Sequence, residues 1–326
     1  MSNKPALKIN FSGFWWSLDK TDNLFYHLLS RHYEVTISEE PDLLFYSTGG
    51  ADHSKYRCTK IFYTGENATP DFMLCDFAFS YQYNTARNYR LPLYALWENV
   101  LTLTNRKIDA RKILDAKTGF CCVVVSNGAC TIRNDFFEAL SKYKRVDSGG
   151  RFMNNIGHAV DNKYDFIRNY KFVIAFENTS FPGYTTEKIY EPFVQHCVPI
   201  YWGDPNVAKD FNTRAFINSH DYPSFEKVIE RVIEVDNNDE LYMQYLQQPV
   251  FTNDEPNEWV DEQNILKRLD EIVAYHFNRK PKLRQAVRPL YHRLLLALDA
   301  VKTTTRRVSR IPAAVIRRLR KHKQNG

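Results

Sequence analysis

Short β-type runs alternate with helical segments along this chain, and the alternation occurs twice. The strands predicted in the first half span residues 7–11, 35–37, 43–46, 61–63 and 77–79, with a helix at 23–29. The strands predicted in the second half span residues 120–125, 172–176 and 199–202, between helices at 133–142, 164–169, 186–195 and 225–235. Because strands separated by helices pair in parallel through crossover connections, the pattern predicts an α/β fold with two parallel sheets.

A helical, charged segment at residues 101–114 separates the two halves, and we interpret it as the connection between two domains. The length of 326 residues fits two domains of roughly 150 residues each. A hydrophobic content of 44% excludes wholesale disorder. We therefore predict an N-terminal domain over residues 1–115, a C-terminal domain over residues 116–280 and a tail over residues 281–326.

The positive charge of the chain is concentrated near this tail. Residues 279–326 carry 15 of the 44 Lys and Arg residues and one of the 38 acidic residues, so this segment has a net charge of +14 and the rest of the chain −8. The net charge of +6 therefore does not describe the main body of the protein, and we expect no nucleic-acid partner.

The tail combines its charge with apolar residues at helical spacing, among them Leu290, Leu294 and Leu298. The apolar runs are too short to span a bilayer. We predict basic amphipathic helices that lie on an anionic membrane surface. A basic helix packed against the acidic core and a nucleic-acid-binding arm are the alternatives.

Six cysteines occur without a CxxC pair and without the Cys and His spacing of a zinc site. Cys121 and Cys122 are adjacent in a predicted strand and would point to opposite faces, which does not suit a disulfide. We predict reduced, buried thiols and a cytoplasmic chain. Since the sequence shows neither a signal-peptide stretch nor a run of 18 apolar residues, we expect peripheral attachment to the inner face of the cell membrane through the tail.

The densest group of polar residues follows a predicted strand of the second half. Glu177 and Asn178 come directly after the strand, Tyr184 lies in the loop, and Glu187 and Lys188 begin the next helix. Ligands bind at the carboxyl ends of parallel strands, and a helix start offers free N–H groups to phosphate oxygens. Taken singly, the lysine is explained as a solvated helix residue and the glutamates as helix-end acids. Taken together, these residues favour an anion-binding site.

Two further residues occupy similar positions. Glu66 follows the predicted strand at residues 61–63 in a Gly-containing turn, where its carboxylate can face the region between the domains. Arg133 begins a helix after a strand, where a guanidinium can bind a phosphate bidentately. Taken singly, an exposed turn acid and a surface arginine are the simpler explanations.

Three segments together resemble the α-1,3-fucosyltransferases of glycosyltransferase family 10, inverting GDP-fucose enzymes with bacterial members. The sequence FENTSFPGYTTEKIYEPF…VPIYWGDP is similar to their donor-binding signature, FYTGEN with TPDF to their general-base segment, and SNGACTIRNDFFEAL to their diphosphate-binding arginine segment. The resemblance is strong over residues 60–220 and weaker before them. Thr185 stands where the family usually has Val, which leaves the linkage preference open.

The resemblance implies two Rossmann-like domains that face each other across a cleft, a fold of the GT-B type, with the acceptor on the N-terminal side. It implies that Glu66 is the catalytic general base that deprotonates the acceptor hydroxyl. The donor-binding residues that it implies are Arg133, Asn178, Tyr184, Glu187 and Lys188. Among these, Arg133 and Lys188 would neutralise the departing diphosphate.

The implied reaction transfers L-fucose from GDP-β-L-fucose, with inversion, to the 3-OH of N-acetylglucosamine in an N-acetyllactosamine-type acceptor, forming a Lewis-type glycan on protein or lipopolysaccharide. The sequence has no Asp-X-Asp motif at a strand end, so we expect no metal site and no obligatory cofactor, with Mn²⁺ or Mg²⁺ at most stimulating turnover. The acceptor, α-1,3 against α-1,4 linkage and the oligomeric state stay open. A transferase for another sugar nucleotide and a protein without catalysis are the alternatives.

Overall fold

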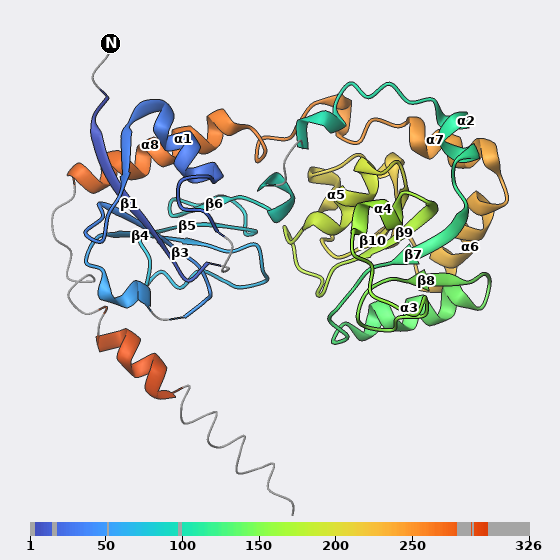
Figure 1. Ribbon diagram of the computed structural model, residues 1–326, viewed down its shortest axis with the longest axis horizontal. Coiled ribbons are helices and arrows are strands. Elements are labelled where there is room, and N and C mark those ends of the chain that lie inside the picture. The colour runs from blue at the N-terminus through green and yellow to red at the C-terminus, as the bar shows by residue number, and fades with distance from the viewer. Residues whose placement is uncertain are drawn as a thin grey trace, which may run out of the picture.

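The computed structural model describes residues 4–14, 18–50, 52–96, 100–278, 288 and 290–298. They form two α/β lobes that lie side by side, each built on one sheet (Figure 1). Every pairing between neighbouring strands is parallel in both sheets. The prediction of an α/β fold of the GT-B type with two parallel sheets is therefore confirmed.

The N-terminal lobe contains a six-stranded sheet in the order β2-β1-β3-β4-β5-β6. Its strands are β1 (Ala6–Ser12), β2 (Glu34–Ile37), β3 (Leu43–Tyr46), β4 (Thr59–Tyr63), β5 (Phe77–Ser80) and β6 (Asn88–Arg90). All residues of β3, β4 and β5 are buried, as expected for parallel strands that are covered on both faces. The chain passes from β1 to β2 on one side and to β3 on the other, so the topological switch point lies between β1 and β3.

The C-terminal lobe contains a five-stranded sheet in the order β11-β10-β9-β7-β8. Its strands are β7 (Gly119–Val123), β8 (Val146–Ser148), β9 (Tyr170–Phe176), β10 (Val198–Trp202) and β11 (Ile217–Asn218). The chain passes from β7 to the edge strand β8 and then to β9 on the other side of β7. The switch point of this sheet therefore lies between β7 and β9.

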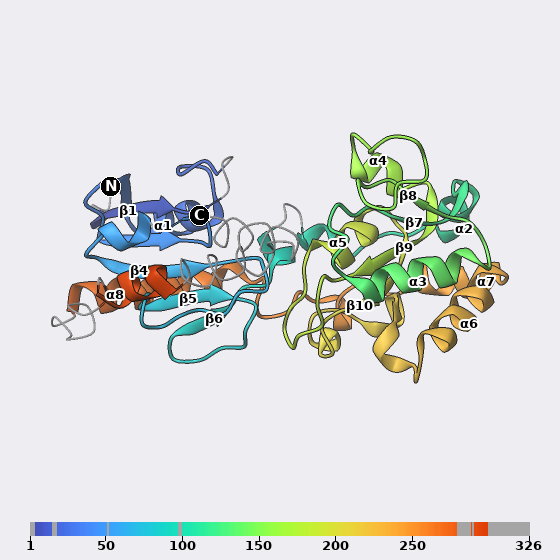
Figure 2. The same cartoon turned by 90° about the horizontal axis from the view of Figure 1, so that it is seen from below.

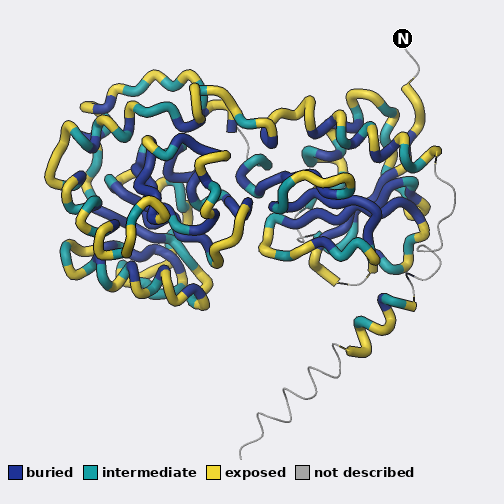
Figure 3. The backbone as a smooth tube through the Cα atoms, turned by 180° about the vertical axis from the view of Figure 1, so that it is seen from behind, coloured by how far each residue is buried: buried dark blue, intermediate teal, exposed yellow. Residues whose placement is uncertain are grey.

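Helices cover the sheets, and the buried strands occupy the middle of each lobe (Figure 3). The helices are α1 (Leu24–His32), α2 (Ala110–Asp115), α3 (Thr131–Ser141), α4 (Lys163–Ile167), α5 (Glu187–Val194), α6 (Phe225–Asp236), α7 (Asp239–Gln247) and α8 (Glu262–Asn278). Helix α1 begins with a side-chain cap, since the Asn23 side chain accepts from the N–H of Tyr26.

The C-terminal lobe does not extend to residue 280, where the sequence places the end of the C-terminal domain. Helix α8 lies with the N-terminal lobe in both views of the ribbon (Figures 1 and 2). Its residues Ile265, Leu269 and Ile272 belong to the same buried apolar cluster as Leu7 in β1 and Leu28 in α1. Residues 262–278, which the sequence assigns to the C-terminal domain, therefore complete the N-terminal core, because the apolar face of α8 is buried there.

The start of the described tail contacts the N-terminal lobe, while most of residues 293–298 are exposed. Arg288 is buried and donates to both carboxylate oxygens of Asp76, at 2.9 and 2.7 Å. The Tyr291 hydroxyl donates to Asp71 at 3.0 Å. Residues 290–298 are helical, and the rest of the tail predicted over 281–326 lies outside the described residues apart from Arg288. Instead of facing a membrane, Arg288 thus packs against the acidic core, which is one of the two alternatives given for the tail.

All six cysteines are free and buried, which confirms the prediction for their thiols. Burial raises the pKa of the Cys75 thiol to about 12, so this group is protonated at neutral pH. In the described part of the chain, no helix combines the length and the apolar character needed to cross a bilayer.

Candidate active site

The donor side of the candidate site lies at the switch point of the C-terminal sheet. Strands β7 and β9 are neighbours there, and the loops after them open on the crevice where ligands bind in open parallel sheets. Arg133 lies on α3 after β7, and Glu177 and Asn178 follow β9. The order of the strands thus brings together two segments that the sequence analysis singled out separately.

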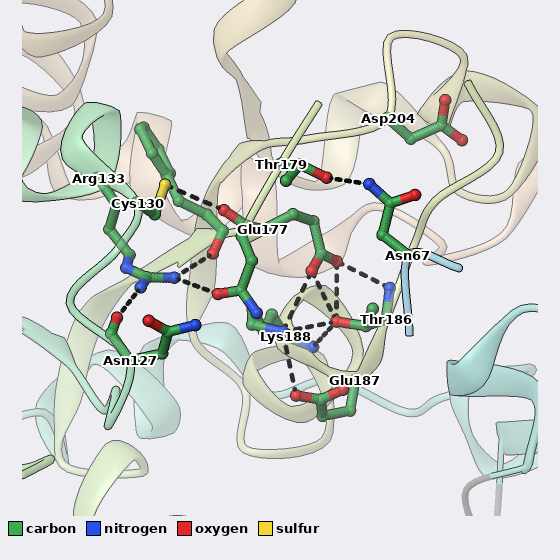
Figure 4. A network of polar contacts seen from close by, with 12 residues as sticks. Asn67, Asn127, Cys130, Arg133, Glu177, Thr179, Thr186, Glu187, Lys188 and Asp204 are labelled. Carbon is green, nitrogen blue, oxygen red and sulfur yellow. Dashed lines mark hydrogen bonds and ion pairs between the residues drawn. The ribbon is translucent and has the colours of Figure 1, made fainter. Parts of the chain in front are cut away.

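Glu177 is the centre of a polar network at the carboxyl end of β9 (Figure 4). Its side chain is fully buried and accepts from the N–H of Thr186 at 2.7 Å and from the Thr186 hydroxyl at 2.8 Å. The Nζ of Lys188 lies 3.2 Å from the same carboxylate. Because Thr186 is the N-cap of α5, the Glu177 carboxylate lies at the positive end of the helix.

Charge and burial act on this pair in opposite directions. Burial raises the pKa of Glu177, and the neighbouring Lys188 ammonium opposes that rise. Burial alone would lower the pKa of Lys188, but Glu177 and Glu187 hold it above its ordinary value. The Lys188 Nζ also lies 3.3 Å from Glu187. Lys188 therefore stays protonated at neutral pH and places a cation at the start of α5.

The start of α5 differs from the expectation of free N–H groups. The Glu177 carboxylate accepts the N–H of Thr186, and the Thr186 hydroxyl accepts the N–H of Lys188 at 3.5 Å. The expectation is wrong for these two groups because an acidic side chain and a capping threonine of the chain itself satisfy them. The cationic side chains, rather than the helix N–H groups, are then the candidates for binding phosphate.

Arg133 is buried and not on the surface. Its Nη1 donates to the carbonyl oxygen of Phe176 at 3.2 Å and to Oδ1 of Asn178 at 3.1 Å, and its Nη2 donates to the carbonyl oxygen of Asn127 at 2.6 Å. Burial lowers the pKa of Arg133. Its buried Nε has no partner among the described residues. Arg133 thus joins the two loops of the switch point and retains a donor for a further acceptor.

The other predicted donor-binding residues surround this network. Tyr184 is buried, and its ring lies edge-on to that of Tyr81 from the N-terminal lobe, with 5.6 Å between centroids. Burial raises the pKa of Tyr184, and the charges of Glu177 and Glu66 act in the same direction. Glu187 is the first residue of α5. The structure therefore gathers all five predicted donor-binding residues at the carboxyl end of one sheet.

Glu66 lies on the other lobe, exposed in the turn after β4. The Thr64 hydroxyl accepts the N–H of Glu66 at 3.0 Å and fixes the turn. Glu66 lines a cavity of about 450 Å³ together with Phe14, Leu93 and the loops after β1 and β3. This cavity lies at the switch point of the N-terminal sheet. Apolar walls beside one carboxylate suit a sugar, which presents both C–H faces and hydroxyls.

One hydrogen bond joins the turn of Glu66 to the donor side. Asn67 Nδ2 donates to the Thr179 hydroxyl at 2.6 Å, from the N-terminal to the C-terminal lobe (Figure 4). Asn67 follows Glu66, and Thr179 follows Asn178. The carboxylate that the sequence analysis selects therefore lies opposite the network around Lys188, an arrangement suited to a base acting on a second molecule beside a bound anion.

From the sequence, Glu177 is predicted only as one member of the anion-binding group, and Thr186, Asn67 and Thr179 are given no part in the site. Thr186 carries a visible signal, because a threonine directly before an acid and a helical run is a typical N-cap. No sequence signal marks the contact between Asn67 and Thr179, which are 112 residues apart.

In the part of the chain that the structure describes, no three His, Cys, Asp or Glu side chains are grouped in a way that could hold a metal ion. Donor binding without a metal stays a prediction.

Comparison with known proteins agrees with this geometry. A model of the alpha-(1,3)-fucosyltransferase FucT N-terminal domain matches residues 9–97, and the C-terminal model of glycosyltransferase family 10 (fucosyltransferase) matches residues 114–269. An alpha-(1,3)-fucosyltransferase FucT of Helicobacter pylori is 33% identical over 300 residues, and the match covers 77% of this chain. The chain spans 62% of the length of that relative.

Crystal structures of an alpha1,3-fucosyltransferase extend the match to three dimensions. The structure with GDP-fucose has a TM-score of 0.70 and 30% sequence identity, and the match covers 86% of this chain and 92% of that chain. A second crystal structure of an alpha1,3-fucosyltransferase gives a TM-score of 0.72 at the same identity, with 86% of this chain and 94% of that chain covered. The chain therefore belongs to glycosyltransferase family 10, the fucosyltransferases.

Proposed function

We propose that this protein is an α-1,3-fucosyltransferase that moves L-fucose from GDP-β-L-fucose to a sugar hydroxyl. The observation that carries the proposal is Glu66 on one lobe, opposite Arg133 and Lys188 on the other, with the Asn67–Thr179 hydrogen bond between them. The likeness to a crystal structure of an alpha1,3-fucosyltransferase with GDP-fucose supports the choice of donor.

In the proposed reaction, the acceptor occupies the cavity beside Glu66, and the diphosphate of the donor lies near Arg133 and Lys188. Glu66 takes the proton of the acceptor hydroxyl while the hydroxyl oxygen forms a bond to the anomeric carbon of fucose. The bond from that carbon to the phosphate oxygen breaks, and its electron pair leaves with GDP, whose charge Arg133 and Lys188 neutralise. A single displacement of this kind inverts the anomeric configuration.

The acceptor that we propose is an N-acetyllactosamine-type glycan of a protein or polysaccharide, with transfer to the 3-OH of its N-acetylglucosamine and a Lewis-type product. The likeness to the alpha-(1,3)-fucosyltransferase of Helicobacter pylori supports this linkage. The cavity of about 450 Å³ beside Glu66 is large enough for a sugar unit. Linkage analysis of products from type 1 and type 2 disaccharides tests it, and transfer to the 4-OH alone would contradict it.

The donor class is tested by thermal unfolding with nucleotides. GDP at 100 times its dissociation constant should stabilise the protein by about 2.7 kcal/mol, a rise of roughly 5 °C in Tm. UDP and ADP at the same concentration should give little shift. The GDP shift should persist with EDTA, because Arg133 and Lys188 supply the positive charge. A larger shift with UDP or ADP would assign the site to another donor.

We further propose that the protein is cytoplasmic and peripheral on the inner face of the cell membrane, attached through its tail. The described tail helix exposes leucines outward, with Leu290 72% and Leu294 55% accessible. Arg288 meanwhile holds the start of this helix against Asp76. This anchoring would keep the catalytic lobes beside lipid-linked acceptors, and basic residues of the tail would add attraction to anionic lipids.

Membrane attachment is tested by sedimentation of the full chain with vesicles of phosphatidylcholine and phosphatidylglycerol. The double variant Leu290→Gln, Leu294→Gln should bind at least about tenfold more weakly, because each leucine loses apolar burial in the interface. Leu101→Gln is the control, since Leu101 is also exposed, at 54%, but lies in the N-terminal half of the chain. A parent protein that stays in the supernatant at low salt would disprove the attachment.

A further inference from the structure

A buried ion pair joins the two lobes beside the donor loop. Arg90, the last residue of β6, donates to both carboxylate oxygens of Asp210, at 2.6 and 2.7 Å. Both side chains are fully buried. The Arg90 guanidinium also stacks on the ring of Trp259, 4.2 Å from its centroid. Because a bidentate pair fixes both partners in one geometry, Asp210 of the C-terminal lobe is held in register with the N-terminal sheet.

The same ion pair reaches the loop that leads into α5. Arg90 Nη2 donates to the carbonyl oxygen of Gly183 at 2.9 Å. Gly183 has a φ of +88°, and a Cβ there would lie 2.4 Å from the carbonyl oxygen of Tyr81 in the N-terminal lobe. The loop is therefore pressed against the N-terminal lobe at a position that only glycine fits without strain.

Thr185 continues this network into the donor side. Its hydroxyl lies 2.9 Å from Oδ2 of Asp210 and 3.1 Å from Oδ2 of Asp204, and all three residues are buried. The hydroxyl has one proton, so it donates to one carboxylate at a time. Burial raises the pKa of Asp204, although the N–H groups of Gly183 and Asn206 and the Arg90 guanidinium, 3.8 Å away, act in the opposite direction. The Thr185 hydroxyl is thus a donor that two buried acids share, beside the Arg90 and Tyr94 donors of Asp210 and the Asn206 N–H donor of Asp204.

The hydrogen bonds of the Thr185 hydroxyl affect the donor side because of the neighbours of Thr185 in the chain. Tyr184 precedes it, and Thr186, the N-cap of α5 that holds Glu177, follows it. A shift of Thr185 would move both of these neighbours. Because Thr186 is bonded to Glu177, the shift would also displace Glu177, which is the ion partner of Lys188.

We infer that Thr185 is a positioning residue for donor binding, which transmits the Arg90–Asp210 contact between the lobes to the loop that carries Tyr184 and Thr186. The inference rests on the proposed function, because it assigns the loop to a nucleoside diphosphate sugar. Thr185 touches no reacting atom in this role. It sets the geometry of Tyr184 and of Thr186, the N-cap that holds Glu177 beside Lys188.

The test uses Thr185→Val, which keeps the shape of the side chain and removes its hydroxyl. Calorimetry with GDP should show about five- to twentyfold weaker binding, because a buried carboxylate loses a donor and the loop loses its anchor. The acceptor KM should stay within twofold of the parent value, since the cavity of Glu66 is untouched. Thr185→Ser should restore GDP affinity to within twofold. Thr36→Val, in the exposed edge strand β2, is the matched control.

A second variant tests the link to the other lobe. Arg90→Lys keeps the charge but loses the fork that meets Asp210 and Gly183, and it should also weaken GDP binding. When the two substitutions are combined, the loss should be smaller than the product of the single losses, because both break one network. If the loss of GDP affinity in the double variant equals the product of the two single losses, the two residues act independently, and the transmission from Arg90 through Thr185 is overturned.

Other outcomes separate the inference from the proposed function. Unchanged GDP affinity in Thr185→Val at a temperature far below its Tm, with only the Tm lowered, would reduce Thr185 to a structural residue and overturn the inference. Failure of Thr185→Ser to restore binding would do the same. Failure of the parent protein to bind GDP would instead remove the proposed donor.

Discussion

Replacing Glu66 by Gln is expected to lower the turnover number by about 10²–10⁴-fold while the affinity for GDP stays unchanged. The amide has the same shape as the carboxylate but cannot take the proton of the acceptor hydroxyl. Glu66 lies on the lobe opposite Arg133 and Lys188, so the substitution leaves their contacts intact. Initial rates at saturating donor and calorimetry with GDP measure the two quantities separately.

The control for this substitution is Glu40→Gln, a change of the same kind at an exposed residue outside the cavity that Glu66 lines. Its turnover number should equal that of the parent protein. Turnover near the parent value in Glu66→Gln would remove Glu66 from the role of general base. A loss of GDP affinity in that variant would instead show that the Asn67–Thr179 contact had been disturbed.

The strands that carry most of the core could be predicted from the sequence. The run at residues 43–46 coincides with β3, and those at 61–63 and 77–79 fall within β4 and β5. These strands are buried along their whole length, so their apolar character is continuous and easily read. The edge strands β6 and β8 were not predicted, because Asn-Tyr-Arg and Val-Asp-Ser are short and carry polar side chains.

The packing of helix α8 against the N-terminal lobe could not be predicted from the helical spacing of its apolar residues. Helix α8 buries Ile265, Leu269 and Ile272 against the N-terminal sheet, although the C-terminal lobe precedes it in the chain. An amphipathic pattern shows that a helix has an apolar face, but it does not identify the surface that the face covers. The predicted boundary at residue 280 therefore placed α8 with the wrong lobe.

The residue types of the candidate site were visible in the sequence, but their bonding was not. Arg133 and Lys188 stand where cations near a strand end are expected. Their present partners, the carbonyl oxygens of Asn127 and Phe176 and the carboxylate of Glu177, come from loops whose proximity depends on the strand order. The residue types of the candidate site could therefore be selected from the sequence, and the sheet topology determines which of its groups are bonded to each other.

Replacing Lys188 by Met is expected to weaken GDP binding by about 2–5 kcal/mol, or at least roughly 30-fold, because a desolvated cation that meets the diphosphate is lost. The same change leaves the buried Glu177 without its ion partner and should destabilise the fold by about 3–5 kcal/mol. GDP calorimetry at low temperature measures the first effect, and denaturant unfolding measures the second.

Lys171→Met separates these two effects. Lys171 forms a largely buried ion pair with Asp236 at 3.0 Å, at the opposite end of β9 from Glu177. This variant should lose stability and keep the parent affinity for GDP. If both lysine variants bind GDP as tightly as the parent protein, the diphosphate does not meet Lys188.

The stability of Lys188→Met should also acquire a distinct pH dependence. Burial already raises the pKa of Glu177, and the variant removes the ammonium that opposes this rise. A carboxyl whose pKa is higher in the folded state than its unfolded value of about 4.3 binds more protons when folded. Its contribution to stability is therefore present below about pH 4 and is lost as the pH rises through the raised pKa. The free energy of unfolding, measured from pH 5 to pH 8, should fall more steeply in Lys188→Met than in the parent protein, and parallel curves would show that Lys188 does not stabilise the Glu177 carboxylate.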